Sequence, residues 1–131
     1  MKNSFNYRIY YEDTDAGGIV YYANYLKFLE RARTDFLLSL GISQSTFILE
    51  NIFFVVKKCE IEYISSAKLE DIITVSCEIA KLSNVFIEFH QEVKIERKLI
   101  VNANIQVVCV KSVAGNFKPH RIPEAISSLI K

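Results

Sequence analysis

A single helical pattern followed by four strand patterns is the feature that most constrains the fold of this chain. From about Ala23 to Leu40, hydrophobic residues recur every three or four positions, which predicts an amphipathic helix. Its apolar face is formed by Tyr25, Phe28, Leu29, Ala32, Phe36 and Leu40. Gly41 is placed to end this helix as its C-cap. The chain therefore has one long helix whose apolar stripe must be covered by another element.

The other patterns alternate with the period of two that is typical of strands. Phe5–Tyr11 precedes the helix, and Ile52–Tyr63 follows it. Three further strands, Ile73–Ile79, Val85–Ile95 and Val101–Cys109, are separated by turns and each has one apolar face. This order predicts an α+β fold in which an antiparallel sheet of about five strands is wrapped around one long central helix. The length predicts one domain over residues 1–131.

The strand predicted over Ile52–Tyr63 also bears on assembly. One face is expected to carry Phe53, Val55, Cys59, Ile61 and Tyr63, with Lys57 as the exception. Its first half, IFFVV, is apolar on both faces, which indicates burial on both sides. A strand of this kind left at a free edge would invite aggregation, so the sequence predicts a homodimer or homotetramer.

Charge and cysteine usage exclude several classes of protein. The 131 residues carry a formal net charge of +1, and no run of Lys or Arg indicates a nucleic-acid partner. No apolar run approaches the length of a membrane span, and the N-terminus has no apolar signal core, so a cytoplasmic location is expected. Cys59, Cys77 and Cys109 form no C-x-x-C motif and share the apolar parity of their strands, which predicts reduced core thiols.

The loop before the helix, EDTDAGG, holds three carboxylates and has three interpretations. It can be an acidic turn whose carboxylates cap the helix and favour its positive end. It can be a phosphotransfer loop, because an apolar strand followed by D-x-D begins the aspartyl-phosphate phosphatases. That fold needs a parallel sheet, which this order of elements does not predict. It can also hold a catalytic carboxylate beside a helix N-terminus, whose free N–H groups would stabilise an oxyanion.

Two longer stretches carry a family resemblance. YYEDTDAGGIVYYANYLKFLERAR resembles the signature of the hotdog-fold acyl-CoA thioesterases, in the 4-hydroxybenzoyl-CoA thioesterase family and its YbgC-like, Tol–Pal-associated branch. The resemblance continues through FVVKKCEIEYISSAKLEDIITV and then weakens toward about Val110. It implies a hotdog fold, dimers that share one continuous sheet and are often paired into tetramers, and thioester hydrolysis.

Carried over residue by residue, the resemblance implies a set of catalytic residues. The catalytic carboxylate falls on Asp15, and the backbone N–H that polarises the carbonyl falls on Tyr22. Tyr11 matches a tyrosine that lines the site, while Asn24 and Tyr25 are interpreted as shaping the helix start. One position departs from the YbgC-like pattern, because that branch usually has His where this chain has Tyr22.

The function implied is hydrolysis of a short-chain, aromatic or fatty acyl-CoA, with Asp15 as nucleophile or general base. An acyl-carrier-protein thioester is a second form of substrate, and a non-catalytic acyl-CoA or acyl-carrier-protein binding or assembly module is the alternative function. No metal is expected. No separate cofactor is expected either, because coenzyme A is part of the substrate. His90 and His120, the only histidines, are expected on a strand surface and in a loop. A hotdog dehydratase is disfavoured because it would need a His in the site.

Several cations remain unassigned by the sequence. Arg33 lies at the edge of the helix's apolar face, where an ion pair is expected before a substrate contact. Several basic residues could bind the coenzyme A phosphates, and the sequence favours no single one of these residues. These residues are Lys57, Lys58, Arg97, Lys98, Lys118 and Arg121.

Overall fold

The computed structural model describes residues 1–130 and contains one long helix and six strands. The strands are β1 (Lys2–Arg8), β2 (Ile52–Tyr63), β3 (Ile72–Leu82), β4 (Phe86–Ile95), β5 (Lys98–Val113) and β6 (Asn116–Pro119). The helices are α1 (Tyr25–Ser39), α2 (Gln44–Ile48) and α3 (Glu124–Ser127), with 3-10 turns at Tyr11–Asp13, Tyr22–Asn24 and Ser128–Ile130. The predicted α+β class is confirmed.

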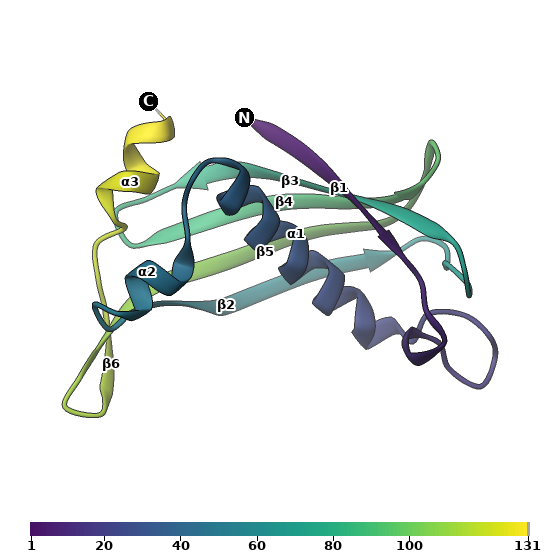
Figure 1. Ribbon diagram of the computed structural model, residues 1–131, viewed down its shortest axis with the longest axis horizontal. Coiled ribbons are helices and arrows are strands. Elements are labelled where there is room, and N and C mark those ends of the chain that lie inside the picture. The colour runs from purple at the N-terminus through teal and green to yellow at the C-terminus, as the bar shows by residue number, and fades with distance from the viewer. Residues whose placement is uncertain (131) are drawn as a thin grey trace.

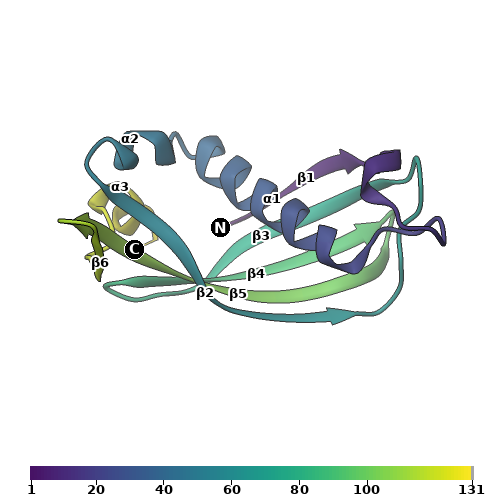
Figure 2. The same ribbon diagram turned by 90° about the horizontal axis from the view of Figure 1, so that it is seen from below.

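The strands form one antiparallel sheet in the order β1-β3-β4-β5-β2, and β6 pairs with the end of β5. The sheet curves around α1, which lies along its inner face (Figures 1 and 2). This is the predicted hotdog arrangement. The short sixth strand was not predicted. Pro119 is its last residue and pairs at the edge of the sheet, where proline is tolerated.

The core lies between α1 and the inner face of the sheet. Tyr25, Phe28, Leu29, Ala32 and Phe36 on α1 are at most 2% exposed, which confirms five of the six residues of the predicted stripe. The sixth, Leu40, is the C-cap residue and packs against the core while only partly buried. The other five face buried residues of the central strands, among them Ile73, Val75, Cys77, Ile87, Phe89 and Val93. Burial of each large apolar side chain contributes about 1.5–3 kcal/mol. This packing holds α1 at a defined position on the sheet.

The end of α1 is set by Gly41, as predicted. Gly41 has a φ of +80°, its N–H donates to Leu38 O (2.9 Å), and the N–H of Ile42 donates to Leu37 O (2.9 Å). These two bonds form a Schellman motif, which satisfies carbonyls that the helix leaves free. The other end differs from the prediction, because α1 begins at Tyr25, after a 3-10 turn over Tyr22–Asn24.

β2 corrects two predictions. The register shifts between Val56 and Lys58, so a β-bulge places Phe53 and Val55 on the outer face and Cys59 and Tyr63 on the inner face. The predicted single face was therefore wrong, and the odd parity of Lys57 was the sign of the bulge. α1 packs against β1 and β3, at the other side of the sheet, so Cys59 is exposed and the prediction of three core thiols holds only for two.

β1 is also shifted toward the N-terminus relative to the prediction, since it spans Lys2–Arg8 and not Phe5–Tyr11. Tyr11 lies in the following 3-10 turn with its side chain 82% exposed. Tyr11 therefore does not share the face of Phe5 and Tyr7, as the alternating aromatics had indicated. No helix within residues 1–130 is long and apolar enough to span a membrane.

Candidate active site

Asp13 organises the loop between β1 and α1. Its side chain is 7% exposed and accepts a hydrogen bond from the N–H of Tyr10 (Oδ2, 2.8 Å). Its backbone carbonyl accepts the N–H of Tyr21 (3.0 Å) and the Nδ2 of Asn24 (3.0 Å). Asp13 thus ties the 3-10 turn that follows β1 to the start of α1, and Asn24 shapes the helix start as predicted.

A second connection comes from the turn between β2 and β3. The N–H of Ala67 donates to the hydroxyl of Tyr25 (3.0 Å), and its carbonyl accepts the N–H of Val20 (2.9 Å). Tyr25 is 2% exposed, and this burial raises the pKa of its phenol. Ile19 also forms a β-bridge with Lys68. The loop is therefore held at its far end by the β2–β3 turn.

Asp15 lies between these two anchors and is exposed. Its Oδ1 accepts the N–H of Gly17 (2.8 Å), and its backbone bonds to Gly18 and Ile19 close a tight turn. Gly18 has a φ of +79°, which a side chain would strain. Within residues 1–130, Oδ2 of Asp15 accepts no hydrogen bond. One carboxylate oxygen thus orients the group, and the other faces outward.

The predicted residues do not all line one pocket. Asp15 and Tyr11 line an open depression of about 420 Å³ together with Leu69, Thr14, Ala16 and Gly18. Tyr22 is not among the lining residues and follows the loop in the chain, at the first position of the 3-10 turn, with its side chain 60% exposed. The backbone N–H groups of Tyr22 and Ala23 have no hydrogen-bond partner among the described residues. Such free donors are what the start of a helix supplies.

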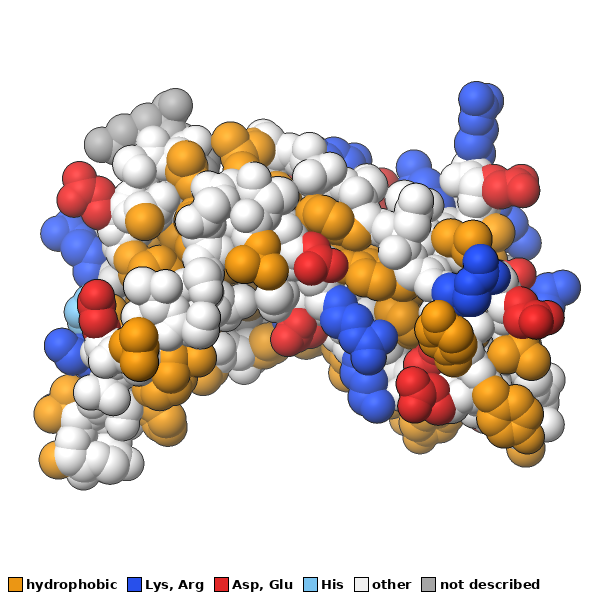
Figure 3. Space-filling model, viewed as in Figure 1, with side chains coloured by type: hydrophobic (Ala, Val, Ile, Leu, Met, Phe, Trp, Pro, Cys, Tyr) orange, Lys and Arg blue, Asp and Glu red, His pale blue; other side chains and the backbone are white. Residues whose placement is uncertain are grey.

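Tyrosine rings continue from the helix start onto β2. Tyr22 meets Tyr63 edge-on, with 6.0 Å between ring centroids, and Tyr63 packs on Tyr25 at 5.8 Å. Hydrophobic side chains gather at the end of the molecule that carries the loop, at the lower right of Figure 3. Sequence reasoning did not single out Tyr63 or Leu69 as site residues. The only signal for Tyr63 was an aromatic residue at the end of a long strand.

A buried polar pair lies under α1. Gln91 of β4 is fully buried, and its Oε1 accepts a hydrogen bond from Nη1 of Arg33 (3.0 Å). The expected ion pair of Arg33 was wrong, because no carboxylate among residues 1–130 lies within 4.0 Å of it. Burial lowers the pKa of the Arg33 guanidinium. The sequence did carry a signal for Gln91, which is the polar residue at an apolar position of its strand.

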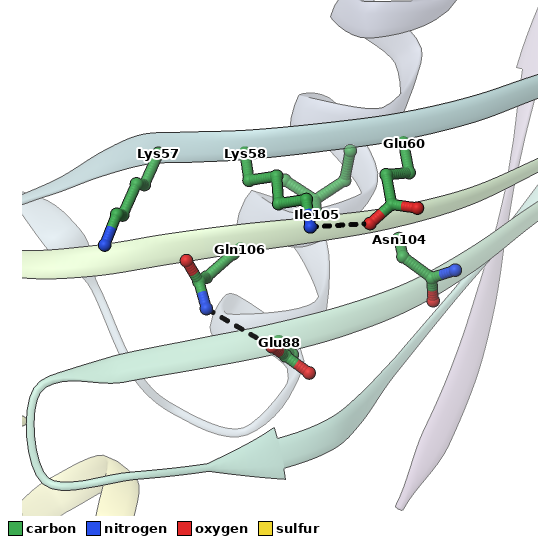
Figure 4. A pocket seen from close by; sticks show the side chains of 7 residues that line it. All are labelled: Lys57, Lys58, Glu60, Glu88, Asn104, Ile105 and Gln106. Atoms are coloured by element: carbon green, nitrogen blue, oxygen red, sulfur yellow. Dashed lines mark hydrogen bonds and ion pairs between the residues drawn. The ribbon is translucent and has the colours of Figure 1, made fainter.

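Other predicted groups lie away from Asp15. Lys57 and Lys58 line a separate pocket on the outer face of the sheet, where Lys58 pairs with Glu60 (3.0 Å) and Gln106 donates to Glu88 (3.2 Å; Figure 4). His90, on β4, is half-buried rather than fully solvated, and its ring contacts Glu78 and Asn102. His120 follows β6, so no imidazole lines the depression around Asp15.

Comparison with known proteins identifies the family. Residues 17–101 match the model of the thioesterase superfamily. The chain is 40% identical over 126 residues to a protein of Haemophilus influenzae named acyl-CoA thioesterase YbgC, covering 95% of this chain and 91% of that protein. A crystal structure of a probable thioesterase from Bartonella henselae is 30% identical, with a TM-score of 0.86 over 94% of this chain and all of that one.

A more distant structure supports the fold alone. The 4-hydroxybenzoyl-CoA thioesterase of a Pseudomonas species is 19% identical, with a TM-score of 0.88 over 96% of this chain and 97% of that one. Together with the family match, these similarities confirm the predicted hotdog hydrolase. The chain belongs to the thioesterase superfamily.

Proposed function

We propose that this protein is an acyl-CoA thioesterase in which Asp15 drives cleavage of the thioester. The observation that carries the proposal is the free Oδ2 of Asp15 in an open depression next to a helix start with two unpartnered N–H groups. The Haemophilus influenzae relative is named an acyl-CoA thioesterase, which supports the choice of substrate class.

The chemistry needs only groups that this chain carries. The thioester carbonyl accepts a hydrogen bond from the N–H of Tyr22, which stabilises the oxyanion that forms. Asp15 either attacks the carbonyl carbon, giving an anhydride that water then opens, or takes a proton from an attacking water. In both routes the C–S bond breaks, coenzyme A leaves as a thiolate that gains a proton, and the acyl group leaves as a carboxylic acid. Tyr11 lines the same depression as Asp15.

The proposal includes a homodimer, and also a tetramer in which two such dimers pair. β2 is an edge strand whose Val55 and Val56 are 42% and 49% exposed, and its inner-face residues Cys59 and Tyr63 are uncovered. A second copy that pairs along β2 would bury these side chains and close the site. Sedimentation at micromolar concentration should therefore show a dimer or larger species, and a stable monomer would contradict this assembly.

Thiol release over a panel of acyl-CoAs tests the activity. The panel contains short-chain, aromatic and long-chain fatty acyl-CoAs, with an acyl-carrier-protein thioester as a separate arm. We expect catalytic turnover of at least one acyl-CoA, detected as free thiol. Calorimetry on the same compounds is the control: tight binding without any thiol release would favour the non-catalytic binding module and would overturn the proposal.

A further inference from the structure

Arg33 and Gln91 form a polar pair between α1 and the inner face of the sheet, where the packing is otherwise apolar. The Nε2 of Gln91 donates to Leu29 O of α1 (3.0 Å) and to Ser76 O of β3 (3.4 Å). Both amide hydrogens are therefore used, and Oε1 is left to accept from Arg33. Gln91 thus fixes where the guanidinium lies, since it can present only its oxygen to that side chain.

No carboxylate among the described residues forms an ion pair with Arg33, although the charge of Glu30 acts to raise the pKa of its guanidinium. Glu30, three residues earlier on α1, accepts the hydroxyl of Thr34 instead (3.2 Å), and Asp35 accepts the hydroxyl of Tyr7. The guanidinium keeps some contact with solvent, since none of its nitrogen atoms is both fully buried and without a hydrogen-bond partner. Arg33 is half-buried and makes this one side-chain hydrogen bond within residues 1–130, so most of its donors remain available to an acceptor.

The guanidinium lies a short way along α1 from the proposed reaction centre. Because Gln91 bonds both Arg33 and Leu29 O, the guanidinium is near the level of Leu29. Leu29 is four residues after Tyr25, about 6 Å along the helix axis. α1 packs on β1 and β3 and leaves the inner face of β2 uncovered, and Tyr63 of β2 contacts Tyr25 at the start of the helix.

We infer that Arg33, oriented by Gln91, binds an anionic or acceptor group at the far end of a short acyl chain, so that the acyl-CoAs preferred by this protein carry a terminal carboxylate. This inference rests on the proposed function. The thioester would lie at the start of α1, and the acyl chain would extend between α1 and the inner face of β2 toward Arg33. Gln91 acts as a positioning residue.

Two acyl-CoAs of equal length provide the test. Glutaryl-CoA and pentanoyl-CoA differ only in that the terminal methyl of the second is a carboxylate in the first. We expect wild-type protein to show a higher kcat/KM for glutaryl-CoA. Arg33→Met should lower the glutaryl-to-pentanoyl ratio of kcat/KM by about 100-fold, the loss expected when one partner of a buried charge pair is removed. Gln91→Glu should lower the same ratio, because its carboxylate would pair with Arg33 and compete with the ligand.

The glutaryl-to-pentanoyl ratio of kcat/KM separates an effect on substrate recognition from an effect on folding. Arg31→Met is the matched control, because Arg31 stacks on Phe28 at the exposed side of α1 and should leave the ratio unchanged. A wild-type ratio of one or less, or an Arg33→Met protein in which both substrates are affected equally, would overturn the inference. If wild-type protein hydrolyses none of the acyl-CoAs of the wider panel, glutaryl-CoA and pentanoyl-CoA included, the proposed function fails. The ratio of the two Kd values, measured by calorimetry, then decides the role of Arg33.

Discussion

The two halves of the loop between β1 and α1 have opposite character. Around Asp13 the loop is closed, because this side chain is buried and bonds the N–H of Tyr10, while the Asp13 backbone carbonyl bonds Asn24 at the helix start. Around Asp15 the loop is open, and one carboxylate oxygen has no partner within the described chain. Two aspartates only two residues apart thus have different environments. We attribute a structural role to the first and propose a chemical role for the second.

The largest effect is expected where the open half meets the helix. Tyr22→Pro removes the proposed oxyanion donor and should lower kcat by about 100-fold or more. The backbone can accept the proline, because Tyr21 has φ −61° and ψ 128°, an extended conformation that suits a residue before proline. Steady-state thiol release measures the loss, and circular dichroism checks that the fold survives. A Tyr22→Pro protein with kcat near the wild-type value would exclude this N–H as a donor.

The pattern of residues predicted the helix stripe, the strand order and the helix end, because each follows from local periodicity or from the backbone freedom of Gly41. It could not separate Asp13 from Asp15 by role, since Asp13 is buried where the loop folds back to bond Tyr21 and Asn24, and local periodicity does not show that contact. The family resemblance supplied that distinction. The bulge after Val56 and the uncovered inner face of β2 also escaped prediction, because they depend on where α1 packs.

A substitution in the closed half of the loop, around Asp13, should lower the free energy of unfolding. Asp13→Ala leaves the N–H of Tyr10 without its carboxylate partner and should lower the free energy of unfolding by about 2 kcal/mol, the range for a hydrogen bond to a charged group. Urea denaturation measures this difference. An Asp13→Ala protein as stable as the wild type would show that the loop does not depend on this bond.

A smaller loss of stability is expected at the far anchor. Tyr25→Phe removes the hydroxyl that accepts the N–H of Ala67, at a cost of about 1 kcal/mol for a neutral hydrogen bond. Urea denaturation again gives the value, with Tyr63→Phe as the control, because the Tyr63 ring is 43% exposed. Equal effects of the two substitutions would argue against Ala67 as an anchor.

The smallest effect is expected from the side chain of Tyr22. Tyr22→Phe keeps the backbone N–H and the ring contact with Tyr63, so kcat should change by less than about tenfold, or roughly 1.4 kcal/mol. The assay is the same thiol release. A loss as large as that of Tyr22→Pro would mean that the phenol takes part in the chemistry, in the place of the histidine that the YbgC-like pattern usually has there.

The most direct test of the central claim compares Asp15→Asn with Asp13→Asn. Each substitution replaces a carboxylate by an amide of similar size, and kcat for thiol release is measured on protein whose folding and assembly match the wild type. The account predicts that Asp15→Asn lowers kcat by about 100-fold or more, since an amide neither attacks a carbonyl nor accepts a proton. Asp13→Asn should lower it far less. Near wild-type kcat in Asp15→Asn would contradict the proposed site.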